Sequence, residues 1–261
     1  MPPSRSLLVC ATPRSGSTLL CESLAATGVA GCPREDFEAL AHSRRRRGPE
    51  EYFTGLDDRE VDAILAQRPD PEPPAAVPEP YEAFLQDAVA RGTTANGVFA
   101  TKLMWGYLGD FLALVRRARP GAPADDLALL LALFPAPEWI WVRRDDVVRQ
   151  AVSLWRAVQT AAWRAEEDGG RGQLTYSRAA IAHLARQLTE QDAAWGRFFA
   201  GRGLQPIVVT YEEELADGVD TVTRRLLRRL GLPDAQVPEP PLRRQADAVS
   251  ERWVERFRDE Q

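Results

Sequence analysis

LLVCATPRSGSTLL, at residues 7–20, is the stretch that decides the fold. Its first part is a short apolar run, which is typical of a buried strand, and its last part begins a helix. The loop between them is tight and contains one glycine. The start of a helix presents unpaired backbone N–H groups and the positive end of the helix dipole. The stretch therefore predicts an anion-binding loop between a strand and a helix.

The side chains of this loop suit an anion with several oxygens. Arg14 has a planar donor fork that matches phosphate or sulfate, and Ser15, Ser17 and Thr18 add hydroxyl donors. A simpler interpretation is that Ser15 or Ser17 caps the helix and Arg14 is exposed. The sequence RSGST at residues 14–18 by itself favours neither alternative.

Alternating apolar strands and helices beyond this stretch indicate an α/β fold, with a mainly parallel central sheet covered by helices on both faces. We expect strands at 7–11, 98–101, 139–142 and 206–211, and helices at 17–27, 50–67, 81–91, 108–118, 125–134, 147–162, 176–199, 221–230 and 251–258. Residues 69–80 are rich in proline, which predicts a stiff connector on the surface. Because the α/β pattern resumes after it, we expect one domain over residues 1–261.

Composition excludes several classes of protein. The 261 residues carry a net charge of −5, so no basic field favours nucleic acid or an anionic membrane. No apolar run is long enough for a membrane span, and the N-terminus does not resemble a secretory signal. Cys10, Cys21 and Cys32 are odd in number and form no C-x-x-C pair, which is typical of free thiols in a reducing cytoplasm. We therefore expect a cytoplasmic protein.

Well-known catalytic motifs are missing from the chain. A P-loop NTPase needs G-x-x-x-x-G-K-[ST] and a dinucleotide-binding fold needs G-x-G-x-x-G, and neither follows the first strand. The two histidines, His42 and His183, fall in a basic loop and in mid-helix, which argues against a serine hydrolase. No cluster of metal-binding residue types occurs, so we expect no metal.

Three further residues are candidates for binding an anion. Lys102, the only lysine in the chain, follows the strand at 98–101, and ligands of open α/β sheets bind beyond the carboxyl ends of strands. Arg144 and Ser153 are nine residues apart and would point to opposite sides of one helix. They can meet at one ligand only if Arg144 lies in the loop before that helix.

Several segments from near the first helix to the last helix resemble the trehalose 2-sulfotransferase family. They are ATGVAG at 26–31 with Glu35 and Phe37, KLMW at 102–105, QAVSLWRAVQT at 150–160, and RQAD at 244–247 with Trp253 and Val254. The eleven-residue segment is long enough to be highly specific. The resemblance implies the P-loop-like sulfotransferase fold, PAPS (3′-phosphoadenosine 5′-phosphosulfate) as the sulfuryl donor, PAP as its product, and a homodimer.

The resemblance also implies roles for individual residues. The loop that binds the 5′-phosphosulfate would consist of Arg14, Ser15, Gly16, Ser17 and Thr18. Arg144 and Ser153 would hold the 3′-phosphate, and Arg244, Gln245 and Ala246 would close over the nucleotide. Glu35 would be the general base for in-line transfer, with Arg14 and Lys102 stabilising charge on the departing phosphate.

The acceptor is less clearly indicated than the donor. A sugar or glycosylated small molecule is implied, with the 2-hydroxyl of trehalose as the first choice. Residues 38–48 are rich in arginine and do not resemble the family well, and the role of the run at 44–47 stays open. Asp36 and His42 are rivals of Glu35 as the base. The alternatives are sulfation of a different hydroxylated metabolite, or a non-catalytic nucleotide-binding protein of the same fold.

Overall fold

Four parallel strands form the central sheet of the computed structural model, which describes residues 2–67, 76–161, 163, 174–216, 218–232, 235–238 and 248–260. The strands are β1 (Arg5–Ala11), β2 (Val98–Met104), β3 (Pro137–Arg143) and β4 (Ile207–Thr210), in the spatial order β2-β1-β3-β4. Their carboxyl ends meet at one edge, where Ala11 pairs with both Met104 and Val142. The loops that follow the strands are therefore brought together there.

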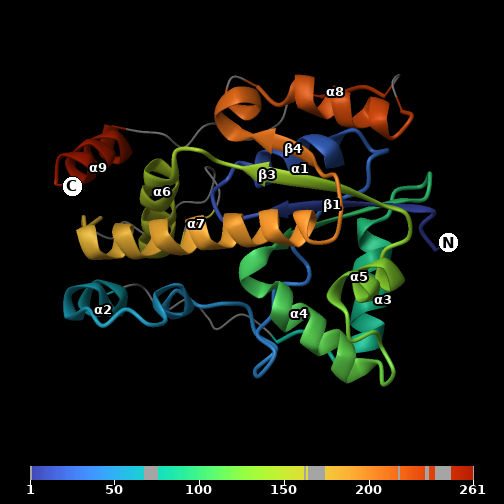
Figure 1. Ribbon diagram of the computed structural model, residues 1–261, viewed down its shortest axis with the longest axis horizontal. Helices are drawn as coiled ribbons and strands as arrows, with labels where there is room; N and C mark the ends of the chain where they lie inside the picture. Colours follow the sequence, from blue (N-terminus) through green and yellow to red (C-terminus); the bar gives the residue numbers. More distant parts are fainter. Residues whose placement is uncertain are drawn as a thin grey trace.

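Helices cover both faces of the sheet. The helices are α1 (Ser17–Ala26), α2 (Arg59–Ala66), α3 (Tyr81–Gly92), α4 (Trp105–Ala118), α5 (Asp126–Leu133), α6 (Val147–Thr160), α7 (Arg178–Ala200), α8 (Asp220–Arg229) and α9 (Ala248–Asp259), with a 3₁₀ turn η1 (Glu50–Phe53) and a π turn η2 (Tyr211–Leu215). All seven residues of β2 are buried, as expected for a strand packed on both sides. Figure 1 shows α8 above the strands and α7 below them. The predicted α/β fold is confirmed.

A second hydrophobic cluster lies beside the sheet and holds the helix that follows β3. In α6, Ala151, Trp155 and Val158 are fully buried and form one apolar face of the helix. They pack with residues of α7 and α9, including Ile181 and Trp253. The last helix of the chain is thereby attached to the helix that carries Ser153.

Two element predictions need correction. Residues 50–67 form not one helix but η1 and α2, because the intervening segment contains Gly55 at φ 84° and Asp58, whose side chain caps α2. The second strand extends to Met104, so Lys102 lies within β2 rather than after it. The predicted connector at 69–80 falls mostly outside the described residues.

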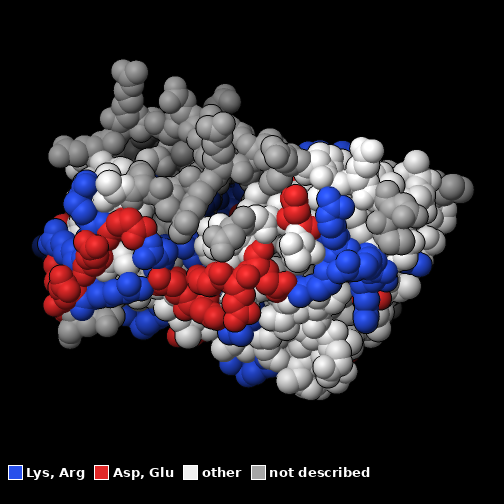
Figure 2. All heavy atoms as spheres, turned by 90° about the horizontal axis from the view of Figure 1, so that it is seen from above, with Lys and Arg blue, Asp and Glu red and all other residues white. Residues whose placement is uncertain are grey.

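Charge is unevenly distributed on the surface. Figure 2, which views the side of the molecule that carries α8, shows acidic and basic side chains in separate neighbouring patches. The glutamates of η2 and the arginines of α8 contribute exposed charge of opposite sign. Within the described ranges, no helix is both long enough and apolar enough to cross a membrane.

Candidate active site

The loop between β1 and α1 leaves the start of the helix without a side-chain cap. Gly16 is the N-cap residue, at φ 89°, and no side chain hydrogen-bonds to the first turn. The alternative in which Ser15 or Ser17 caps the helix is therefore wrong. Ser15 Oγ is buried and has no hydrogen-bond partner in the described part of the chain. A buried hydroxyl and uncapped N–H groups at the same helix start suit a bound anion.

Two buried side chains hold this loop in place. Gln150, on α6, donates from Nε2 to Thr12 Oγ1 at 2.9 Å and to the Pro13 carbonyl oxygen at 2.7 Å. The indole of Trp195, on α7, donates to the carbonyl oxygen of Ala11 at 3.0 Å. Neither residue was predicted as part of the site, although Gln150 begins the specific segment at 150–160. The loop is thus fixed by helices that are distant in sequence.

Gly16 is required at its position for two reasons. Its φ of 89° is in the left-handed region, and a Cβ there would lie 2.6 Å from Cδ2 of Tyr211. We expect Gly16→Ala to lower the free energy of unfolding by about 2–4 kcal/mol, because backbone strain and steric overlap add. Urea denaturation measures this loss.

Gly28→Ala is the matched control for Gly16→Ala. Gly28 also has a positive φ, of 68°, but a Cβ there would meet nothing within 4 Å. It should cost only the backbone strain, about 1–2 kcal/mol. Equal losses in the two variants would contradict a steric role for Tyr211.

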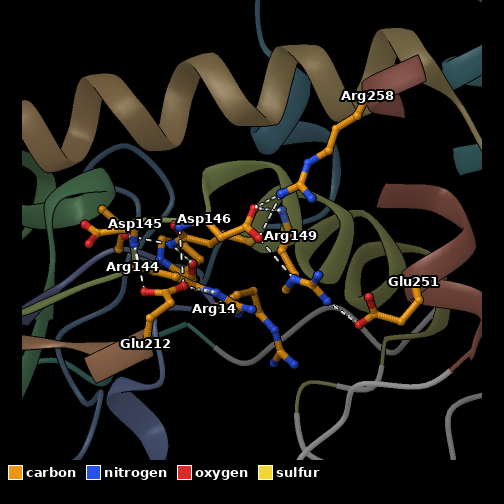
Figure 3. Close-up of polar contacts among 11 residues, drawn as sticks. Arg14, Arg144, Asp145, Asp146, Arg149, Glu212, Glu251 and Arg258 are labelled. Carbon is orange, nitrogen blue, oxygen red and sulfur yellow. Dashed lines mark hydrogen bonds and ion pairs between the residues drawn. The ribbon is translucent and has the colours of Figure 1, made fainter. Parts of the chain in front are cut away.

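Arg14 and Ser153, which the sequence separates widely, are in direct contact. Arg14 Nε donates to Ser153 Oγ at 3.0 Å, and Nη1 donates to the carbonyl oxygen of Trp163 at 2.6 Å. Arg144 donates from Nη1 to the carbonyl oxygen of Arg14 at 3.1 Å. Arg144 precedes α6, as the spacing required, and Figure 3 shows its side chain beside Arg14. The structure therefore brings these three residues together.

Arg144 is positioned by residues that follow β4. Its guanidinium carbon lies 4.4 Å from the centre of the Tyr211 ring, and its Nε lies 3.5 Å from Glu212 Oε1. Burial lowers the pKa of Arg144, and the Tyr211 and Glu212 groups only partly oppose this. Glu212 also accepts hydrogen bonds from the backbone N–H groups of Asp145 and Asp146. Tyr211 and Glu212 were not predicted, since no motif marks them.

A network of ion pairs attaches α9 to the start of α6 (Figure 3). Asp146 caps α6 and pairs with Arg149 Nε at 3.0 Å and with Arg258 Nη2 at 2.9 Å. Arg149 in turn pairs with Glu251 on α9. The predicted nucleotide loop at Arg244, Gln245 and Ala246 lies outside the described residues, shortly before α9.

Glu35 is linked to the helix start through Lys102. Glu35 Oε2 lies 2.6 Å from Lys102 Nζ, which donates to Thr18 Oγ1 at 3.2 Å. The backbone N–H of Lys102 donates to the Arg34 carbonyl oxygen at 2.9 Å, so β2 fixes the segment that carries Glu35. A carboxylate, an ammonium group and a hydroxyl of the loop thus form one continuous chain.

The charge of Lys102 depends on this contact. Burial by itself would lower the pKa of Lys102, but the Glu35 carboxylate and other nearby groups bring the pKa above its ordinary value. Lys102 is therefore a stably protonated cation in a buried position.

Among the described residues, no group of three or more His, Cys, Asp or Glu side chains could hold a metal ion.

A second carboxyl group, on Glu38, lies near Glu35. Its Oε2 is 3.7 Å from Arg46 Nε, and its side chain is 16% exposed. Burial, followed by the charge of Glu35, raises the pKa of Glu38 to about 7. The sequence did not mark Glu38, because its proximity to Glu35 depends on how residues 35–38 turn.

Glu38 predicts a pH dependence of stability. Between about pH 4.5 and 7 the folded protein keeps a proton on Glu38 that the unfolded chain has lost. Unfolding then releases a proton, so the contribution of this residue to stability falls as the pH rises through that window. We expect a fall of up to about 3 kcal/mol, which Glu38→Gln should abolish. Urea titrations at several pH values measure it, and equal slopes in both proteins would contradict the assignment.

Comparisons of the sequence with known proteins show what the chain is similar to. The family model described as Stf0 sulphotransferase matches residues 6–260. The chain is 39% identical over 260 residues to a trehalose 2-sulfotransferase of Mycobacterium tuberculosis (strain ATCC 35801 / TMC 107 / Erdman). The aligned residues make up 98% of this chain and 95% of that protein. It is also 39% identical to the trehalose 2-sulfotransferase of Mycolicibacterium smegmatis (strain ATCC 700084 / mc(2)155), over 96% of this chain and 93% of that protein. The resemblance stated from the sequence is confirmed.

Proposed function

The chain belongs to the Stf0 sulphotransferase family and is a sulfotransferase, and we propose that it transfers a sulfuryl group from PAPS to the 2-hydroxyl of trehalose. The observation that carries this proposal is the chain of contacts from Glu35 through Lys102 to Thr18. It joins a carboxylate that could accept a proton to the anion-binding start of α1.

The residues at the start of α1 fit the donor. PAPS supplies the sulfuryl group and leaves as PAP. Ser15, with its buried and unpartnered hydroxyl, would bind its 5′-phosphosulfate together with Arg14, Gly16, Ser17 and Thr18. Arg144 and Ser153 would hold the 3′-phosphate, an assignment supported by their contacts with Arg14. Arg244, Gln245 and Ala246 complete the proposed donor site.

Glu35 would act on the acceptor. It takes the proton of the attacking hydroxyl while the new oxygen–sulfur bond forms and the bond from sulfur to the 5′-phosphate oxygen breaks. Lys102 and Arg14 would stabilise the negative charge that grows on the departing phosphate oxygen, a role supported for Lys102 by its hydrogen bond to Thr18. The chain's own cations supply this stabilisation.

Trehalose is proposed as the acceptor because both relatives named above are trehalose 2-sulfotransferases. Incubation with ³⁵S-PAPS and a panel of sugars and hydroxylated metabolites tests it. Labelled trehalose sulfated at the 2-position is the expected product. Label on another acceptor alone would overturn the choice of trehalose, and PAP binding without any labelled product would favour a non-catalytic nucleotide-binding protein.

The remaining parts of the proposal concern the whole protein. A single sulfotransferase domain over residues 1–261 is supported by the family match over 6–260. Cys10, Cys21 and Cys32 are free cysteines, which is compatible with a cytoplasmic location. A homodimer is proposed from the family resemblance, and analytical ultracentrifugation of the purified protein measures it.

A further inference from the structure

One carboxylate ties the turn between β3 and α6 to the segment that follows β4. Glu212 accepts a hydrogen bond from the backbone N–H of Asp145 at 3.0 Å and another from that of Asp146 at 3.3 Å. Its Oε1 also lies 3.5 Å from Arg144 Nε. Glu212 thus contacts three consecutive residues, and Figure 3 shows its carboxylate facing Arg144 and Asp145.

The π turn η2, which carries Glu212, is packed against the loop at the start of α1. A Cβ on Gly16 would lie 2.6 Å from Cδ2 of Tyr211 and 3.1 Å from Cδ1 of Leu215, so both side chains lie against this glycine. Tyr211 also stacks on Arg144, with 4.4 Å between the guanidinium carbon and the ring centre. The turn therefore contacts the donor loop and Arg144 at the same time, which fixes Glu212 relative to both.

The contacts of Arg144 leave one of its nitrogen atoms uncommitted. Nε faces Glu212, and Nη1 donates to the carbonyl oxygen of Arg14 at 3.1 Å. Nη2 has no hydrogen-bond partner within the described ranges. Because the guanidinium group is planar, contacts at Nε and Nη1 fix the direction in which the N–H groups of Nη2 point.

The surroundings of Nη2 determine how a phosphate group would bind here. Ser153 Oγ accepts from Arg14 Nε at 3.0 Å, so the hydrogen of the Ser153 hydroxyl stays available to donate. The backbone N–H groups of Asp145 and Asp146 are already occupied by Glu212. A phosphate beside this turn would therefore bind to side-chain donors, Arg144 Nη2 and the Ser153 hydroxyl, rather than to the backbone.

We propose that Glu212 is a positioning residue for the 3′-phosphate of the donor, because it holds the turn at 144–146 and directs Arg144 Nη2 at that phosphate. This inference rests on the proposed function, which assigns the 3′-phosphate to Arg144 and Ser153. A carboxylate and a phosphate repel each other, so Glu212 acts through Arg144 and not by direct contact. It thereby determines how strongly the site selects a nucleotide that carries a 3′-phosphate.

The test compares PAP with adenosine 5′-phosphate, which lacks only the 3′-phosphate, as ligands of the Glu212→Gln variant. Glutamine has the size of glutamate, but its amide nitrogen cannot accept the second backbone hydrogen bond. We expect the Kd for PAP, measured by calorimetry, to rise about 10-fold, and the Kd for adenosine 5′-phosphate to change less than about twofold. The KM for PAPS should rise with kcat within about threefold of the wild type.

A role of Glu212 in folding alone would give a different result. It would lower the melting temperature and weaken both nucleotides equally. An equal loss for the two nucleotides, an unchanged Kd for PAP, or tighter binding of PAP would each overturn the proposal.

Glu213→Gln is the matched control, since it makes the same change of charge in the same turn. Glu213 is exposed and has no hydrogen bond or ion pair in the part of the chain that the structure describes. This variant should bind both nucleotides as the wild type does. If it loses as much affinity for PAP as Glu212→Gln, net charge explains the loss and the positioning role is wrong.

Arg144→Met separates this inference from the proposed function. It should lower the preference for PAP over adenosine 5′-phosphate by about 10- to 100-fold, and adding Glu212→Gln to it should cause no further loss. If Arg144→Met loses the preference while Glu212→Gln keeps it, the role of Glu212 is wrong and the proposed function stands. If Arg144→Met keeps the preference, the assignment of the 3′-phosphate to Arg144 is wrong as well.

Discussion

Replacing Glu35 with Gln is expected to lower kcat for sulfuryl transfer by about 10²–10⁴-fold. The amide has the size of the carboxylate but cannot accept the proton of the attacking hydroxyl. Because Glu35 is linked to Thr18 of the donor loop through Lys102, the affinity for PAP should stay within about twofold of the wild type. Turnover with ³⁵S-PAPS and calorimetric titration with PAP measure the two quantities separately.

Asp36→Asn is the matched control for Glu35→Gln. The Asp36 carboxylate lies 3.3 Å from Arg91 Nη2 and 3.8 Å from Arg34 Nε, so it is already paired on the side of α3. We expect this variant to keep most of its turnover. If Asp36→Asn loses turnover and Glu35→Gln keeps it, Asp36 is the general base instead of Glu35. His42 is exposed and is tested in the same way by His42→Gln.

The second large effect is expected from Arg14→Lys, which should lower kcat/KM for PAPS by about 10²–10³-fold. Lysine keeps the charge but loses the planar fork. Arg14 uses Nε for Ser153 and Nη1 for the Trp163 carbonyl oxygen, and a single ammonium group cannot repeat this geometry. Initial rates at varied PAPS concentration measure the change.

Arg149→Lys separates a general effect of arginine loss from the effect at Arg14. Arg149 lies nearby on α6 but pairs with Asp146 and Glu251 and is not assigned to the donor site. This control should change kcat/KM for PAPS by less than about threefold. Equal losses in both variants would show that the charge of the whole region matters and that the fork of Arg14 has no special role.

Much of the fold could be predicted because it depends on local pattern. The continuous apolar run at 139–142 became β3, and Ala151, Trp155 and Val158 form the buried face of α6. The prediction of one helix over residues 50–67 was wrong, although the sequence contains the residues that divide this segment in two. Gly55 ends the first turn and Asp58 caps α2, and both residue types favour such roles.

The sequence predicted individual residues of the candidate site but not the hydrogen bonds between them. The requirement that Arg144 precede a helix is confirmed, yet Ser153 hydrogen-bonds to Arg14. Gln150, which holds the loop at Thr12, looked like one polar residue among others on a helix. Its role appears only when β1 and α6 are adjacent in space.

The sequence by itself determined the order of strands and helices, the strand–loop–helix arrangement around residues 12–18 and membership of a sulfotransferase family. Each of these depends on residues that are neighbours along the chain, or on a long specific segment. Only the tertiary structure decided which of the 38 acidic residues meets Lys102 and that Arg47 and Gln191 both lie close to Gly106. These contacts join distant residues, because the packing of β2, α4 and α7 brings their side chains together, and no local pattern encodes that packing.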